Sequence, residues 1–177
     1  EEEAQLAPIS PYGVTKAACE MMLGTWRSCY GVPSVALRFF TVYGPRQRPD
    51  LAIHKFARMI DAGEAIPVFG DGSTSRDYTH VSDLCAGVLS ALDRLRVGTL
   101  KHPVYNLGSD SPIRLDALIA AIERAVGKAA VIDRQPMQQG DVVRTWADLS
   151  RSRDELGYAP AIDFDEGLAD FVRWLRG

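Results

Sequence analysis

The sequence predicts an α/β fold, because short apolar runs of strand length alternate along the chain with longer amphipathic stretches. Two segments illustrate the alternation: residues 34–40 form a β-branched run, and residues 115–126 repeat apolar side chains at helical spacing before a glycine. With 177 residues, of which 46% are hydrophobic, the chain is long enough for one well-buried core and too short for two large ones. We therefore expect residues 1–177 to form a single α/β unit.

The first expected element is a helix over residues 8–30. Ser10 can accept hydrogen bonds from the first free backbone amides, and Pro11 suits the first helical position. Apolar side chains then recur at helical spacing as far as Cys29, and Gly31 and Pro33 end the helix.

The remaining elements are expected where periodic segments are bounded by turn residues such as Gly44-Pro45 and Asp71-Gly72. Strands are expected over residues 34–40, 66–69, 77–81, 104–107 and 130–133. Helices are expected over residues 51–62, 82–94, 115–126, 149–156 and 166–175.

Composition argues against several classes of partner. A net charge of −3 and a pI near 5.6 do not favour a nucleic-acid partner. No apolar run approaches the roughly 18 residues that a membrane span needs, and no leader sequence opens the chain. The three cysteines, Cys19, Cys29 and Cys85, follow no pairing or metal-binding pattern. We expect them to be reduced core thiols in a cytoplasmic protein that has no metal site.

The candidate catalytic residues are Tyr12 and Lys16. Four residues apart at the start of a helix, their side chains project from the same face. A free phenol has a pKa of about 10, and a fixed ammonium nearby favours the phenolate, so the pair suits an acid/base in a redox reaction. On this spacing alone, an ordinary exposed tyrosine and lysine remains the alternative.

Six motifs in order give the sequence a resemblance to a known family. They are residues 10–16 (SPYGVTK), 37–46 (LRFFTVYGPR), 69–72 (FGDG), 76–81 (RDYTHV), 105–108 (YNLG) and 140–142 (GDV). In order and spacing they resemble the extended short-chain dehydrogenases/reductases, and within them the NAD-dependent nucleotide-sugar 4-epimerases.

The resemblance implies the C-terminal portion of a Rossmann-type enzyme. About residues 1–50 would be the last part of the parallel sheet with the catalytic helix, and about residues 51–177 mostly the substrate-binding lobe. The sequence has no Gly-rich dinucleotide fingerprint, and the family's NAD-binding segment would precede Glu1. The chain is then expected to be inactive without that half, whether it is a truncated piece or an independently encoded fragment.

The resemblance also implies roles at the cofactor. Tyr12 is the catalytic base, and Lys16 holds the nicotinamide ribose of NAD and tunes Tyr12. The backbone of Phe40 lies by the nicotinamide, while the side chains of Phe39 and Phe40 are expected to be core aromatics.

Further residues match the family's UDP-sugar site. Thr41 faces the sugar, Arg76 binds the pyrophosphate, Asp141 accepts from the ribose hydroxyls, and Val68 and Phe69 lie along the uracil. Simpler readings stay open: a surface arginine, an aspartate that forms a turn, and a Val-Phe pair in the core. His80 and Asp83 could suggest a catalytic dyad, but we expect Asp83 to lie in the first turn of a helix, where it favours the helix dipole.

The sugar is a finer prediction. Thr41 and Arg48 resemble the UDP-glucuronate 4-epimerases, in which a guanidinium near the sugar would suit a carboxylate. UDP-glucose 4-epimerase, sugar 4,6-dehydratase and UDP-glucuronate decarboxylase are the alternatives within the enzyme class. A non-catalytic module that binds a sugar nucleotide or a partner is the alternative outside it.

A second copy of the chain is the expected protein partner. In relatives, the helix that matches Pro11–Tyr30 packs against its own copy, and here it carries Met21, Met22, Trp26 and Cys29. The sequence therefore predicts a homodimer through this helix.

Overall fold

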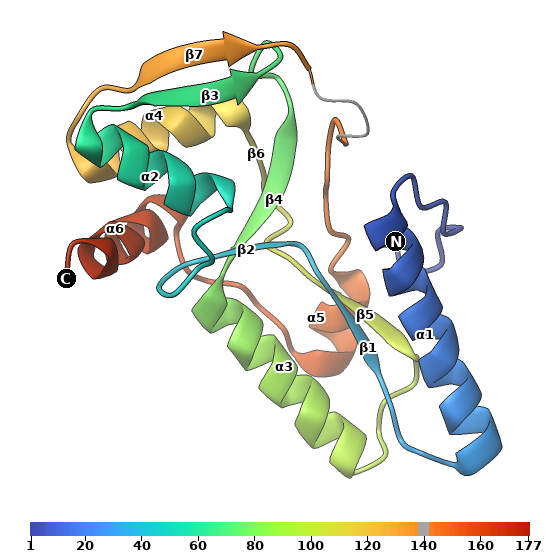
Figure 1. Cartoon of the computed structure of the whole chain (residues 1–177). Helices are drawn as coiled ribbons and strands as arrows, with labels where there is room; N and C mark the ends of the chain where they lie inside the picture. Colours follow the sequence, from blue (N-terminus) through green and yellow to red (C-terminus); the bar gives the residue numbers. More distant parts are fainter. Residues whose placement is uncertain (138–141) are drawn as a thin grey trace.

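The computed structural model describes residues 1–137 and 142–177 and confirms the α/β fold. The helices are α1 (Pro11–Tyr30), α2 (Ala52–Ala62), α3 (Val81–Arg96), α4 (Leu115–Val126), α5 (Ser150–Leu156) and α6 (Phe164–Leu175). The strands are β1 (Ala36–Phe39), β2 (Thr41–Tyr43), β3 (Ala65–Phe69), β4 (Ser75–His80), β5 (Val104–Leu107), β6 (Pro112–Arg114) and β7 (Val131–Gln135). Figure 1 shows α1 beside β1 at one edge, and α2, α4 and α6 gathered near β3 and β7 at the other.

One extended segment passes from one sheet to another at Phe40. Before it, β1 pairs in parallel with β5, with Phe39 beside Leu107. After it, β2 pairs in parallel with β4, with Thr41 beside Tyr78. The short β6 adds an antiparallel edge to β4, and β3 and β7 form a separate parallel pair. The segment therefore links the β1–β5 pair to the β2–β4–β6 sheet and fixes how the two are placed relative to each other.

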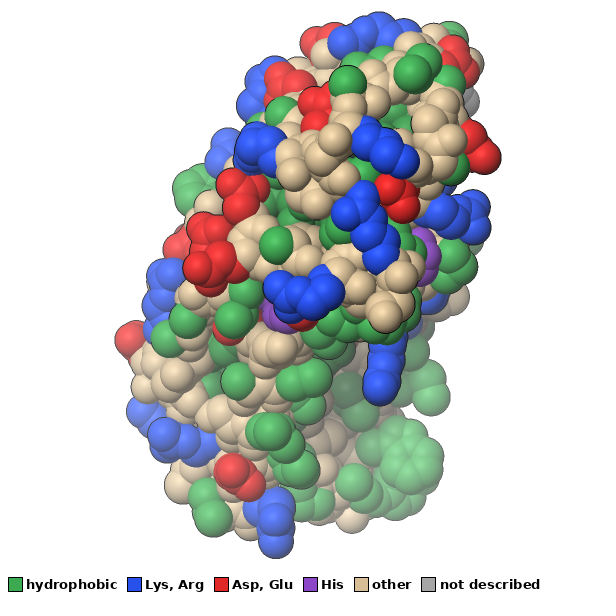
Figure 2. All heavy atoms as spheres, turned by 90° about the vertical axis from the view of Figure 1, so that its left-hand side faces the viewer, with side chains coloured by type: hydrophobic (Ala, Val, Ile, Leu, Met, Phe, Trp, Pro, Cys, Tyr) green, Lys and Arg blue, Asp and Glu red, His purple; other side chains and the backbone are tan. Residues whose placement is uncertain are grey.

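Two hydrophobic clusters flank this segment. The first lies among β2, β3, β4, α2, α4 and α6, and its largest fully buried side chains include Tyr43, Ile53, Ile122 and Phe171. The second lies among α3, β5 and α5 and includes Tyr105, Leu107, Leu149 and Leu156. Figure 2 shows acidic and basic side chains interspersed over the outer face of the molecule nearest α2 and α6.

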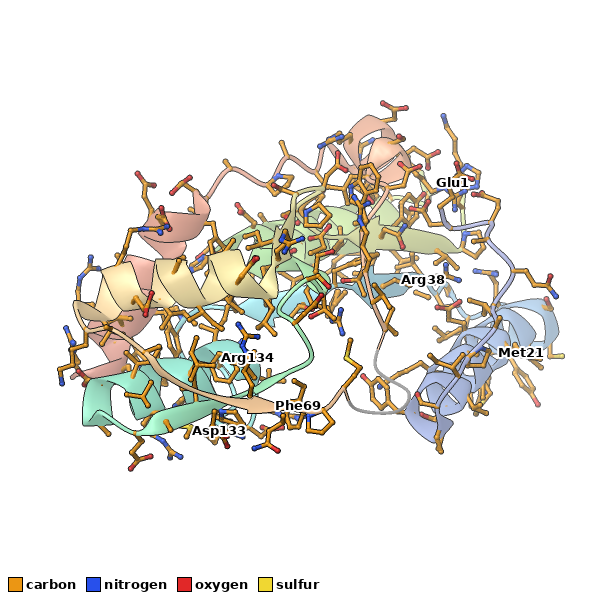
Figure 3. All side chains as sticks on the ribbon, turned by 90° about the horizontal axis from the view of Figure 1, so that it is seen from above. Glu1, Met21, Arg38, Phe69, Asp133 and Arg134 are labelled. Atoms are coloured by element: carbon orange, nitrogen blue, oxygen red, sulfur yellow. The ribbon has the colours of Figure 1, made fainter. Side chains whose placement is uncertain are left out.

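Helix α1 begins as its sequence predicts but buries none of its residues. Ser10 Oγ accepts from the Gly13 amide at 3.1 Å, and Gly31 ends the helix in the left-handed conformation, with φ of 66°. The helix starts at Pro11 rather than at residue 8, because the Ser10 cap closes its first turn. A bidentate ion pair between Glu20 and Arg38, 2.8 Å long, links it to β1. Met21 lies away from β1 and is 72% exposed (Figure 3).

Three expectations need correction. The cysteines are not core thiols, since Cys19, Cys29 and Cys85 are all exposed. Strands β2 and β6 were not expected, because three-residue strands are too short to show a period and exist through their pairing with β4. Helix α6 starts earlier than residue 166, because Asp163 caps it by accepting from the amides of Asp165 and Glu166.

A buried carboxylate holds the two clusters together. Asp77, in β4, is fully buried. Its Oδ1 accepts from the Ser109 amide at 2.7 Å and from the Ser109 hydroxyl at 2.9 Å. Its Oδ2 accepts from the amides of Asp110 and Ala147, both at 3.1 Å. One side chain thus ties β4 to the turn after β5 and to the segment that leads into α5.

We predict that Asp77→Asn destabilises the protein by about 3 kcal/mol, because the new amide cannot accept from both backbone donors that now meet Oδ2. Urea unfolding of both proteins measures the difference. Asp133→Asn, at an exposed position of β7, is the control and should change stability by less than about 0.5 kcal/mol. Equal stability of the two variants would contradict the prediction.

Candidate functional site

A groove of about 760 Å³ between α1 and β1 contains the predicted catalytic pair. Tyr12, Lys16 and Cys19 line it from α1, and Arg38 and Phe39 line it from β1. The Ser10 cap fixes the first turn of α1, so it also fixes the position from which Tyr12 projects. The groove places a phenol and an ammonium beside the carboxyl end of a parallel strand, where α/β proteins bind ligands.

Within the groove, Tyr12 and Lys16 lie side by side as their spacing predicts. The Lys16 ammonium stands over the Tyr12 ring, 5.1 Å from the ring centroid. Tyr12 is 71% exposed, so its hydroxyl is open to a ligand. A cation at this distance is attracted to the face of an aromatic ring, so the contact helps to hold the two side chains together in the groove.

The two phenylalanines at the end of β1 differ from expectation in the exposure of one side chain. Phe40 is partly buried against the second hydrophobic cluster, and its backbone amide donates to the Leu107 carbonyl at 3.1 Å. Phe39 is not a core aromatic: it is 51% exposed and lines the groove with Tyr12. Phe39 is the last residue of β1 and Phe40 lies between β1 and β2, and the sequence alone could not show which of the two side chains is covered. Thr41 follows, half-buried, as the first residue of β2.

The loop after β2 carries Arg48 and is held by one glutamine. Gln47 Nε2 donates to the Val42 carbonyl at 2.8 Å, and Gln47 Oε1 accepts from the His54 amide at 3.1 Å. The His54 ring Nδ1 lies 2.7 Å from the Gln47 carbonyl. Arg46 adopts a φ of 68°, which is uncommon for a residue other than glycine and shows how tightly the loop is constrained. Sequence reasoning missed this anchor, because Gln47 and His54 form no recognisable motif.

Arg48 itself is exposed and paired with Asp50. Its Nε lies 3.1 Å from Asp50 Oδ1, and its Nη2 lies 2.6 Å from Asp50 Oδ2. The hydrogen bond with Asp50 raises the pKa of Arg48, and Tyr12 raises that pKa further by a smaller electrostatic contribution.

The predicted nucleotide residues are brought together in part. Phe69 and Arg76 line the same hollow of about 160 Å³, with Pro67 and Tyr78. Phe69 lies at the end of β3 that points toward the side where α1 lies (Figure 3). Val68 is 1% exposed and packs in the first cluster, so its side chain is closed to a ligand. Asp141 lies outside the described residues.

His80 and Asp83 are structural, as the sequence predicts. His80 Nδ1 accepts from the Ser82 amide at 3.3 Å and caps α3. Asp83 lies in the first turn of α3, and its two oxygens accept from the amides of Ala161 and Ile162. Both side chains thus hold backbone amides in place and form no dyad with each other.

Two general properties concern the whole described chain. Among residues 1–137 and 142–177, no group of three or more His, Cys, Asp or Glu side chains is placed to hold a metal ion. Within the same ranges, no helix combines the length and the apolar character needed to cross a membrane.

Comparison with known proteins relates this geometry to one family. The model of a family described as GDP-mannose 4,6 dehydratase matches residues 1–171. The UDP-glucuronate 4-epimerase of Thermodesulfobacterium geofontis is 36% identical over 170 residues, which are 96% of this chain and 51% of that protein. The chain spans about half the length of the curated relatives it matches.

Solved structures of two epimerases are also similar to nearly the whole of this chain. The UDP-glucuronic acid 4-epimerase from Bacillus cereus, in complex with UDP-glucuronic acid and NAD, gives a TM-score of 0.91 at 32% identity, covering 99% of this chain and 55% of that one. The UDP-glucose 4-epimerase from Thermotoga maritima, with UDP-glucose, gives a TM-score of 0.86 at 30% identity, covering 96% of this chain and 54% of that one.

Proposed function

Because the chain belongs to the GDP-mannose 4,6 dehydratase family of NAD-dependent nucleotide-sugar epimerases and dehydratases, we propose that it supplies the catalytic helix and the nucleotide-sugar lobe of a UDP-sugar 4-epimerase. The observation that carries the proposal is the groove in which Lys16 stands over Tyr12 beside the carboxyl end of β1. Activity requires an NAD-binding half of the kind that the full-length relatives have. We place the protein in the cytoplasm, where exposed thiols stay reduced.

The chemistry follows from the residues in the groove. When bound, NAD supplies the acceptor and donor of the hydride at the sugar C4. In this proposal Tyr12 takes the proton of the C4 hydroxyl and returns it after the 4-keto sugar has rotated to present its other face. We assign the Lys16 ammonium, which stands over the Tyr12 ring, to the nicotinamide ribose. We assign the nicotinamide to the part of the groove that Phe39 lines, next to the Phe40 backbone.

The UDP-sugar is assigned to the lobe. Arg76 is suited to the pyrophosphate because its planar fork matches two phosphate oxygens. Phe69 lines the same hollow and offers a ring face to the uracil. We assign Thr41 to the sugar and, from its sequence motif alone, Asp141 to the ribose hydroxyls, whereas the Val68 side chain is closed to a ligand.

We propose UDP-glucuronate as the substrate, because Arg48 is exposed on the loop that follows β2 and already binds a carboxylate in the bidentate manner. UDP-glucose is the main alternative, followed by the dehydratase and decarboxylase reactions. A non-catalytic sugar-nucleotide module is the alternative outside enzymes, and it predicts binding of UDP-sugar without turnover under any reconstitution.

Replacing Tyr12 tests the catalytic assignment. With the N-terminal half of the Bacillus cereus relative fused ahead of Glu1, Tyr12→Phe should lower turnover by about 10² to 10⁴ with little change in substrate binding, because only the proton acceptor is lost. Tyr30→Phe, at the other end of α1, is the control. Near-normal turnover of Tyr12→Phe would remove Tyr12 from the mechanism.

Replacing Arg48 tests the substrate. In the same fusion, Arg48→Ala should lower kcat/KM for UDP-glucuronate by about 10- to 100-fold more than for UDP-glucose, which is the usual value of a charge-assisted pair. Arg114→Ala, which removes a similar exposed guanidinium from a similar Arg-Asp pair, is the control. An equal loss on both substrates would assign Arg48 to the nucleotide.

We also propose a homodimer through α1, because this helix exposes Met21, Met22, Trp26 and Tyr30. Sedimentation velocity should show a dimer at micromolar concentration, and Trp26→Glu should shift it toward monomer. Leu89→Glu, at an exposed apolar position of α3, should leave it unchanged. A monomer at high micromolar concentration would contradict the interface.

A further inference from the structure

Arg48 and Asp50 are paired in the geometry that an arginine uses to bind the carboxylate of a ligand. Two hydrogen bonds, of 3.1 and 2.6 Å, join the guanidinium to both carboxylate oxygens. This is the geometry in which an arginine binds any carboxylate, including that of a sugar acid. The side chains are 73% and 62% exposed, so both groups remain accessible to an incoming molecule.

The backbone holds the pair in place. Gln47 fixes the loop on one side of Arg48 through the Val42 carbonyl and the His54 amide. On the other side, Leu51 donates to the Arg48 carbonyl at 3.3 Å and is the N-cap of α2. Asp50 therefore sits just before a helix N-terminus, which favours its negative charge and keeps it beside Arg48.

From these contacts we propose that Asp50 is a specificity-determining residue that competes with the ligand for Arg48. A sugar carboxylate can exchange with Asp50, because it offers the same two oxygens to the guanidinium. A neutral hydroxymethyl group offers one weaker acceptor and leaves the Arg48–Asp50 pair intact. Asp50 thus lowers the affinity for acidic sugars alone. The inference rests on the proposed function.

A lowered affinity for acidic sugars suits an epimerase that works in both directions. Substrate and product differ at C4 and carry the same C6 carboxylate, so a strong Arg48 contact would retain both. Because the Asp50 carboxylate competes for Arg48, it weakens the binding of substrate and of product equally. Exposed ion pairs contribute little, and the expected effect on binding is therefore about two- to fivefold.

Calorimetric titration of the 177-residue chain with UDP-glucuronate and UDP-glucose tests the proposal. Asp50→Asn should tighten UDP-glucuronate binding about two- to fivefold relative to UDP-glucose. The UDP-glucose titration measures the general effect of removing a negative charge. Asp116→Asn is the matched control, because Arg114 and Asp116 form the same pair, two residues apart, at the start of α4. Its UDP-glucuronate to UDP-glucose ratio should stay at the wild-type value.

The possible failures are distinguishable. If Arg48→Ala weakens UDP-glucuronate binding but Asp50→Asn leaves the ratio unchanged or lowers it, the competition by Asp50 is wrong and the proposed substrate stands. A rise in the ratio with Asp116→Asn as large as that with Asp50→Asn would also overturn the competition. If no UDP-sugar binds any of these proteins, the assignment of the UDP-sugar to this lobe is wrong, and the inference fails with it, while turnover by the fusion protein still tests the proposed function separately.

Discussion

The Asp77 carboxylate is the contact on which the arrangement of the molecule depends. It accepts four hydrogen bonds from Ser109, Asp110 and Ala147, and every one of them crosses from β4 to the other half of the chain. Gly108 is required beside it, because a Cβ there would lie 2.5 Å from the Ala147 Cβ and 3.1 Å from Asp77 Oδ2. A buried charge is stable only when its hydrogen bonds are satisfied, so this junction permits one arrangement.

The positions of the candidate site residues depend on the hydrogen bonds of Asp77. Arg76 and Tyr78 flank Asp77 in β4, and Tyr78 is the partner of Thr41 in β2. Because β2 continues β1, the register that places Thr41 also places Phe39 in the groove with Tyr12. The groove at Tyr12 and the hollow at Arg76 are thus both positioned by the segment that passes from β1 to β2.

Local signals were sufficient to predict most helices and the longer strands. Ser10 with Pro11, and glycines at 63 and 127, act through the backbone of their own segment, and the helices begin or end beside them. Exposure was harder to predict, because it depends on what packs against a segment. Cys19 and Phe39 look like core residues by type and are exposed. The site motifs indicated Tyr12, Lys16 and Arg48, whereas the Gln47 anchor and the Asp50 partner arise from contacts that no sequence period encodes.

The hydrogen bonds of Gln47 determine which residues of the loop after β2 can be substituted. Its amide binds the Val42 carbonyl and the His54 amide, so the loop keeps its course without help from the side chains at 46 and 48. Those two positions point outward and add nothing to the core. Changes at Arg48 and Asp50 are in this way separated from the stability of the fold, so a library that varied these two positions would change the surface of the loop on an unchanged scaffold.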